Sequence, residues 1–207
     1  TNKMASFAGT SMAIYQYSRK IRYDFKLLAI VAFFAFIASR LGAKSVSMID
    51  IDKLKPLVLI LLIVVAAYVF FKKDLGKIQG KKVPLVKQMI LGSLIGFGVG
   101  FYDGFFGPGT GSFLVLGFVL VLGFEFVAAS AYSKVINGVT NISAIIVFAS
   151  KGNFLLEIAI PMALCNATGS IIGSRMALHR GNSFVRMVFL IVVSIMIARY
   201  AYEVFWQ

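Results

Sequence analysis

The chain has 207 residues, of which 59% are hydrophobic, and its formal net charge is +13. Soluble domains are typically about 45–50% apolar, so this composition excludes an ordinary soluble enzyme or binding module. The positive charge does not indicate a nucleic-acid-binding protein, because the lysines and arginines gather at the ends of apolar stretches rather than on one face of a soluble module.

Apolar stretches follow one another along the whole chain. Most are long enough to cross a hydrocarbon core about 30 Å thick as a helix, which takes roughly 20 residues. They predict an all-α integral membrane protein with a single transmembrane domain over residues 1–207. In chain order the predicted spans lie near residues 2–18, 26–43, 54–71, 83–106, 111–124, 127–150, 154–177 and 183–206.

The two ends of the chain repeat each other with a constant shift of 131 residues, which pairs Lys3 with Lys134 and Thr10 with Asn141. The register continues without a gap over roughly 60 residues, as expected of an internal repeat. Such repeats are typical of secondary transporters. The predicted organisation is the remainder of a first repeat at 1–71, a basic cytoplasmic loop at 72–87 and a second repeat at 83–207.

The repeat also predicts that part of the first copy precedes residue 1. Shifted back by 131 residues, the glycine-rich segment at 100–113 and the span leading into it both fall before Thr1. We therefore expect an N-terminal truncation of roughly 50–60 residues, which would hold the first copy of this broken span.

Basic residues predict the orientation of the spans, because cytoplasmic loops carry an excess of lysine and arginine. Residues 72–87 contain six lysines and 19–26 is also basic, so both are expected to face the cytoplasm. Residues 174–186 are basic and also expected inside, whereas 151–153 and 40–55 are expected outside. The first repeat and the second then have opposite orientations, which predicts an inverted-topology repeat.

The sequence GFYDGFFGPGTGSF at residues 100–113 breaks the pattern of the spans. Glycines and Pro108 interrupt a helix, and irregular backbone at membrane depth is tolerated only inside protein or beside a cavity. We expect a glycine-broken or re-entrant helix pair whose second helix points its free N–H groups inward, which favours an anion. The glycines do not form a P-loop, because the Gly-Lys-Ser/Thr ending of that motif is absent, which argues against an ATPase. The candidate binding residues here are Gly107, Gly109, Gly111 and Ser112.

A second polar set lies on one helical face and recurs in both repeats. Two lysines and two polar stripes related by the repeat predict a cationic site between the repeats, because ionisable residues within spans are costly and mark functional sites. The alternative is that each lysine snorkels to a membrane interface. The set comprises Lys134, Asn137 and Asn141 at i, i+3 and i+7, with Lys3, Ser6 and Thr10 at the same spacing and Asn2 beside Lys3.

Asp103 brings a carboxylate into an apolar run just before the glycine break. It could pair with Lys134, carry a proton that couples transport, or cap the helix that follows. We place it at the substrate site, close to Lys134, with Lys3 and Lys134 approaching a shared cavity.

These residues resemble the TauE/SafE family of sulfite exporters and organosulfonate permeases, in particular its YfcA-like branch. The matching pieces are GFYDGFFGPGTGSF, SAYSKVINGVTNISAIIVF and the leading TNK…GT, although the first glycine motif is missing. The resemblance implies a multi-pass protein of the bacterial inner membrane that moves a small anion, such as sulfite or a sulfonate, without ATP. Its implied partners are the lipid bilayer, the small anionic substrate and a proton as candidate coupling ion.

Two other functions stay open: a membrane-embedded enzyme acting on lipid, and an assembly subunit without transport activity. An enzyme would need a nucleophile paired with a base, or a metal cluster. The single histidine, His179, and the single cysteine, Cys165, lie on different predicted elements and supply neither. The sequence therefore favours a transporter with no catalytic residue, metal, cofactor or nucleic-acid partner.

Overall fold

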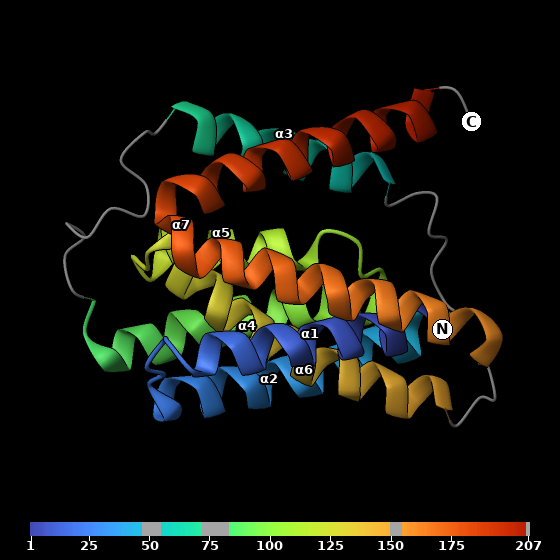
Figure 1. Cartoon of the computed structure of the whole chain (residues 1–207), viewed down its shortest axis with the longest axis horizontal. Coiled ribbons are helices and arrows are strands. Elements are labelled where there is room, and N and C mark those ends of the chain that lie inside the picture. Colours follow the sequence, from blue (N-terminus) through green and yellow to red (C-terminus); the bar gives the residue numbers. More distant parts are fainter. Residues whose placement is uncertain (47–54, 72–82, 150–154, 206–207) are drawn as a thin grey trace.

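The computed structural model of the protein describes residues 1–46, 55–71, 83–149 and 155–205. Within these residues every regular element is an α-helix, and the helices run side by side along the long axis of the molecule (Figure 1). In chain order they are α1 (Asn2–Ser18), α2 (Phe25–Ser45), α3 (Lys55–Phe71), α4 (Leu85–Phe105), α5 (Thr110–Val121), α6 (Phe126–Ala149) and α7 (Leu156–Phe205).

The helices have the lengths and surfaces of membrane spans. In the described part of the chain, α2, α4, α6 and α7 are long and apolar enough to cross a membrane. Large apolar side chains point outward from them, such as Phe33 on α2, Leu94 on α4 and Ile195 on α7, each more than 60% exposed. Lipid tails accept such a surface, whereas water does not. The all-α membrane class predicted from the sequence is confirmed.

The last element, α7, consists of two helices joined at Gly181. This residue has φ of 74° and ψ of −164°, a backbone conformation outside the helical region. The chain reverses there, so that the first half of α7 lies beside α1 and the second half runs back beside α3 (Figure 1). The predicted spans at 154–177 and 183–206 match these halves, but the loop predicted at 174–186 is wrong. Its residues are helical up to and beyond one glycine, which alone makes the turn because it tolerates a positive φ.

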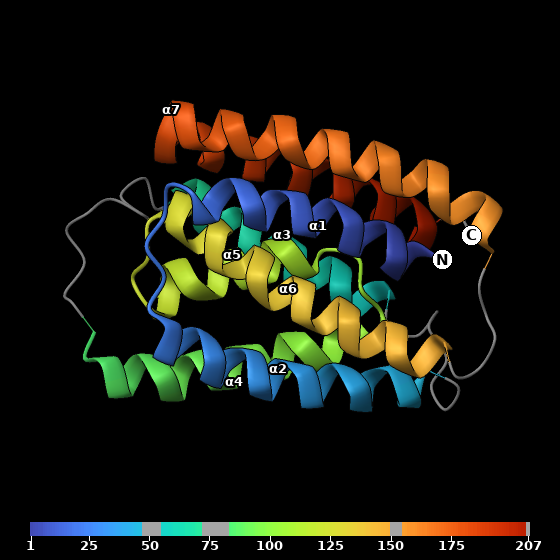
Figure 2. The ribbon, with the colours of Figure 1, turned by 60° about the horizontal axis from the view of Figure 1, so that its bottom comes forward.

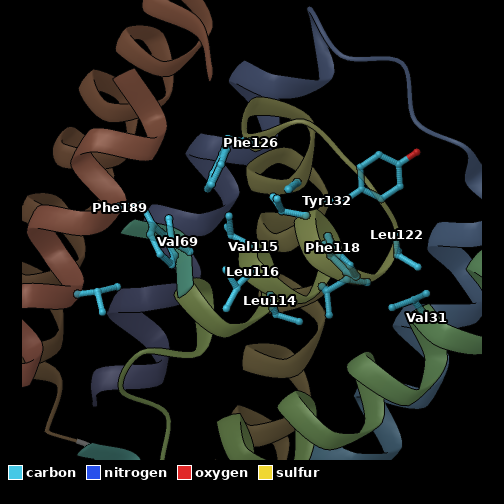
Figure 3. Packing of buried hydrophobic residues seen from close by; sticks show 14 of the residues in the cluster. Val31, Val69, Leu114, Val115, Leu116, Phe118, Leu122, Phe126, Tyr132 and Phe189 are labelled. Atoms are coloured by element: carbon cyan, nitrogen blue, oxygen red, sulfur yellow. The ribbon is translucent and has the colours of Figure 1, made fainter. Parts of the chain in front are cut away.

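The short helix α5 occupies the centre of the bundle. Its 12 residues extend about 18 Å at 1.5 Å per residue, too short to cross a hydrocarbon core of about 30 Å. Leu114, Val115 and Phe118 of this helix are buried among side chains from α2, α3, α6 and α7 (Figure 3). Helix α5 therefore returns from the end of α4 into the protein interior, as predicted for a broken pair.

Helix α4 packs against α2 through a glycine seam, formed by Gly92, Gly96, Gly100 and Gly104 (Figure 2). A Cβ added at Gly100 would lie 2.8 Å from the carbonyl oxygen of Ala35, and one at Gly104 would overlap the carbonyl oxygen of Ser39. Small residues let helix backbones approach closely in membrane proteins. The seam holds the end of α4, and with it the start of the glycine break, at a fixed place beside α2.

The helix order brings two of the basic segments to the same end of the bundle. The connection from α1 to α2 and the turn at Gly181 both lie at the left end of the molecule in Figure 2. Helices α2 and α7 begin 131 residues apart, at Phe25 and Leu156, as the repeat requires. Residues 72–82, 151–153 and 47–54, on which other orientation predictions rest, lie outside the described residues. The inverted topology itself stays a prediction.

Candidate functional site

The glycine break begins where α4 ends, at Phe105, and closes where α5 begins, at Thr110. Gly107 and Gly109 have φ of 91° and 82°, values that favour glycine. The hydroxyl of Thr110 donates to the carbonyl oxygen of Gly107 at 2.6 Å and closes the turn. Gly111, predicted as part of the non-helical turn, instead lies in the first turn of α5, because the helix starts before it.

Asp103 forms an ion pair with Lys3 beside this break. The Lys3 Nζ lies 2.7 Å from Asp103 Oδ1, and the two side chains are 16% and 2% exposed. The second carboxylate oxygen, Oδ2, is buried with no hydrogen-bond partner in the described residues. A Cβ built on Gly107 would lie 3.4 Å from the same Nζ, so the ammonium packs against the break itself. The prediction that Asp103 lies close to Lys134 is therefore replaced by a pairing with Lys3.

A hydrogen-bonded polar cluster joins α1 to α6 deeper in the bundle. Asn137 Oδ1 accepts from the hydroxyl of Thr10 and from the side-chain amide of Asn141, both at 3.3 Å. Thr10 and Asn141 are almost fully buried. The equivalent positions 10 and 141 of the two repeats thus donate to the same acceptor, Asn137 Oδ1. Within the described residues, the bond from Thr10 to Asn137 is the one hydrogen bond between the two predicted polar stripes.

Lys134 borders a cavity of about 550 Å³ between α1, α5, α6 and α7. From the predicted site residues, this cavity brings together Gly111, Ser112, Lys134 and Asn137. Among the residues that the structure describes, none forms an ion pair or hydrogen bond with the Lys134 side chain. Lys134 is partly buried. Its side chain therefore borders the cavity without a counter-ion from the residues that the structure describes.

Two further donors face the same cavity. Ser133 is 2% exposed, and its hydroxyl has no hydrogen-bond partner in the described part of the chain. The cavity also reaches Gly111 and Ser112 in the first turn of α5, where a helix carries a partial positive charge. The Ser112 N–H donates to the carbonyl oxygen of Gly109, so of these two residues only Gly111 has an N–H without an acceptor in the described part of the chain. The cavity thus combines a lysine, a free hydroxyl and a helix N-terminus, a set of groups that can bind an anion by charge and hydrogen bonds.

Lys3 and Lys134 do not share this cavity, contrary to the prediction. Helices α1 and α6 run in opposite directions, and Thr10 lies opposite Asn137. Lys3 is seven residues from Thr10 towards one end of the bundle, and Lys134 is three residues from Asn137 towards the other. Ten residues of helix separate the lysines by about 15 Å along the axis. The antiparallel packing therefore separates these two equivalent lysines, although the equivalent Thr10 and Asn141 meet at Asn137.

Of the remaining predicted residues, Asn2 is exposed at the start of α1 and Ser6 is partly buried. Neither lines the cavity at Lys134. Gly107 and Gly109 shape the break but do not line the cavity; a Cβ built on them would meet Lys3 and Met196, respectively.

The sequence analysis missed the wall that α7 contributes to the cavity. Gly173, Ala177 and Val188 line it, together with Tyr17 of α1. Gly173 was interpretable from the sequence only as a packing residue, because small residues on a helix face indicate close contact without saying what the space contains. In the described residues no group of three His, Cys, Asp or Glu side chains is arranged to hold a metal ion.

Comparison with known proteins identifies relatives over nearly the whole chain. The family described as "Sulfite exporter TauE/SafE" matches residues 1–200. A probable membrane transporter protein of Haemophilus influenzae is 29% identical over 206 residues, which cover 100% of this chain and 80% of that protein. The probable membrane transporter protein ORF9 of a Sinorhizobium species is 34% identical over 200 residues, covering 96% and 75%.

A third relative, the probable membrane transporter protein YfcA of Escherichia coli K12, is 32% identical over 208 residues, covering 98% of this chain and 75% of that protein. No solved structure was found that matches the chain. The relatives are named as transporters and not as enzymes, in agreement with the helical membrane architecture. The chain therefore belongs to the TauE/SafE family of bacterial multi-pass membrane transporters.

Proposed function

We propose that the protein is a secondary transporter of a small anion such as sulfite or a sulfonate, and that the anion binds in the cavity at Lys134. The observation that carries the proposal is the ammonium of Lys134 beside this cavity, for which the described ranges of the chain supply no counter-ion. A charge within a membrane protein is costly unless an opposite charge accompanies it. A substrate anion would supply that charge.

The other cavity groups support a tetrahedral or pyramidal oxyanion. The hydroxyl of Ser133 can donate to one oxygen, and the N–H of Gly111, in the first turn of α5, can donate to another. A volume of about 550 Å³ is larger than sulfite alone needs and accommodates a short organosulfonate with water. The family description, which names a sulfite exporter, is consistent with this substrate class.

Asp103 is the candidate for proton coupling. Its carboxylate neutralises Lys3 in the interior, so protonation of Asp103 would leave Lys3 with an unmatched positive charge beside the glycine break. That unmatched charge, about 15 Å from Lys134 along the helix axis, would attract an anion over distance rather than by contact within the cavity. The coupled movement of a proton and an anion would follow, in the manner of intramembrane carboxylates that relay protons.

The test measures uptake of labelled sulfite and of methanesulfonate by the purified full chain in sealed liposomes. Lys134→Gln should weaken the apparent affinity at least tenfold, equivalent to about 1.4 kcal/mol. The matched control is Lys87→Gln, because Lys87 is exposed in the first turn of α4; this variant should behave like the original chain. Equal effects of the two substitutions would refute the site at Lys134.

The coupling proposal has its own readout. Asp103→Asn removes the proton-accepting oxygen and should abolish the pH dependence of uptake while binding of methanesulfonate at Lys134 remains measurable. An unchanged pH dependence in this variant would remove Asp103 from the coupling mechanism. Detection of a covalently modified substrate in the liposome assay would instead indicate that the protein is an enzyme.

A further inference from the structure

A basic groove of about 690 Å³ lies at one end of the bundle and shares no lining residue with the cavity at Lys134. Its walls come from the end of α1, the first turn of α6 and the last turns of α7 before Gly181. The connection from α1 to α2, which is predicted to face the cytoplasm, lies at the same end (Figure 2). The protonatable side chains that line the groove are Arg19, Lys20, Arg175 and His179.

The positive charges of this groove have no acidic partner in the described residues. None of the residues that line it is an aspartate or a glutamate. Within the same described ranges, the side chains of Arg19, Lys20 and Arg175 form no ion pair. Arg19 instead lies over the ring of Tyr15, with its Cζ 5.8 Å from the ring centroid. Because like charges repel one another, an anion in the groove would relieve the repulsion between α1 and α7.

The rest of the groove is lined largely by apolar side chains, namely Ile21, Val127 and Leu178. Large exposed side chains continue this surface along both helices, since Tyr15 is 58% exposed and Ile172 is 60% exposed. Tyr15 lies one turn before Arg19, and Ile172 lies one turn before Arg175. A free phosphate ion gains nothing from such a surface. A phospholipid has its phosphate directly beside its acyl chains and matches both parts.

The repeat indicates that this side of α7 faces lipid. Shifted by 131 residues, Ile172 and Arg175 correspond to Leu41 and Lys44 of α2. Both of these residues are exposed although α4 packs along α2, because α4 contacts another face of that helix, at Ala35. A helix packed on α7 as α4 packs on α2 would therefore leave the equivalent surface of α7 exposed.

We propose that the groove binds the headgroup of an anionic phospholipid, whose acyl chains lie along α1 and α7. The guanidinium groups of Arg19 and Arg175 can each donate two hydrogen bonds to phosphate oxygens. Lys20 adds a third positive charge. Basic pockets between membrane helices suit such headgroups. A lipid held from both sides would link α1, in the first repeat, to α7, in the second. This proposal does not depend on the substrate site at Lys134.

The test measures lipid binding to the purified full chain in detergent by native mass spectrometry. The probes are dioleoylphosphatidylglycerol and dioleoylphosphatidylcholine, which have the same acyl chains and a phosphate each but differ in net charge. The chain should bind one phosphatidylglycerol molecule about tenfold more tightly than phosphatidylcholine, because basic side chains near the membrane surface attract anionic headgroups.

Matched double variants separate the groove from general surface charge. Arg19→Gln/Arg175→Gln should lose the preference for phosphatidylglycerol. Arg22→Gln/Arg180→Gln removes two charges as well, from exposed arginines near the same end that do not line the groove. This control should bind phosphatidylglycerol like the original chain. Unfolding by SDS without added lipid should be the same for both double variants, which shows that a loss of binding is not a loss of fold.

Two results would overturn the lipid site. Equal losses of phosphatidylglycerol binding in the two double variants would show that the surface attracts anionic lipid only by its overall charge. Displacement of the lipid by an excess of glycerol 1-phosphate, which has no acyl chains, would show that the groove takes free phosphate compounds instead. Uptake of methanesulfonate that needs Lys134 would remain compatible with either result, so the proposed function is judged separately.

Discussion

Removing one member of the Lys3–Asp103 ion pair is expected to destabilise the fold more than removing both. The pair is short, at 2.7 Å, and its side chains are only 16% and 2% exposed. A single substitution therefore leaves the other charge in the interior without a partner. Lys3→Met keeps the length of the lysine, and Asp103→Asn keeps the shape of the carboxyl group. Each alone should lower the free energy of unfolding by about 3–5 kcal/mol.

The double variant Lys3→Met/Asp103→Asn contains neither charge. Its remaining defect is a buried amide that lacks a hydrogen-bond partner, which costs about 1–3 kcal/mol. The double variant should therefore be more stable than either single variant by about 2 kcal/mol. This reversal of order follows from the geometry of the pair and would not occur if Lys3 were a solvated end of α1.

The free energies of unfolding are measured for the four proteins as purified full chains in mixed micelles, with the helical signal followed as SDS is increased. The same cycle on Arg199 and Glu203 is the control. That pair has a comparable separation of 3.0 Å, but its arginine is 78% exposed, so no coupling should be resolved. If the double variant loses the sum of the two single losses, the Lys3–Asp103 pair contributes nothing and the reasoning is refuted.

Three other changes test the architecture. Gly100→Val should destabilise the chain strongly, because its Cβ would lie 2.8 Å from a carbonyl oxygen of α2. Gly98→Ala, on the same helix but with open space around it, is the control. It should be neutral or stabilising in the same SDS titration. Gly181→Ala should lower the free energy of unfolding by about 1–3 kcal/mol through its backbone conformation alone, because φ of 74° with ψ of −164° is a region that essentially only glycine occupies. No atom lies within 4 Å of the added Cβ, so a larger loss would show that the turn has a packing role. In a cysteine-free background, an impermeant reagent outside the cell should modify Gly152→Cys and spare Gly80→Cys; the reverse pattern would contradict the inverted repeat.

The helices were predictable from the sequence because a membrane-spanning helix requires a long stretch of apolar residues. The break was predictable for the opposite reason, since glycine and proline concentrated at 107–111 cannot continue a regular helix without loss. The start of α5 was misplaced only slightly: the hydroxyl of Thr110 bonds back to Gly107 and allows the helix to begin before Gly111.

The partners of the charged residues were not predictable in the same way. A repeat shows that Lys3 and Lys134 are equivalent, but equivalence does not say which groups meet in space. Because α1 and α6 pack antiparallel, the two lysines lie at different positions along the axis of the bundle. Asp103 forms its ion pair with Lys3. The α7 wall was missed because a residue such as Gly173 adds space rather than chemistry, and no pattern of side chains marks it.

The close packing between α2 and α4 gives a lipid-facing helix control over the site. A Cβ on Gly42 of α2 would lie 2.9 Å from the backbone nitrogen of Phe105, the last residue before the break. Contacts between two backbones cannot be relieved by a change of side-chain rotamer. The contact with α2 therefore fixes the position of α4, and with it Asp103, along the axis of the bundle. Substitutions at Gly42 or Ser39, which touch no cavity at Lys134, should therefore change the pH dependence of uptake proposed to depend on Asp103. Positions that affect transport would then extend well outside the residues proposed to bind the anion.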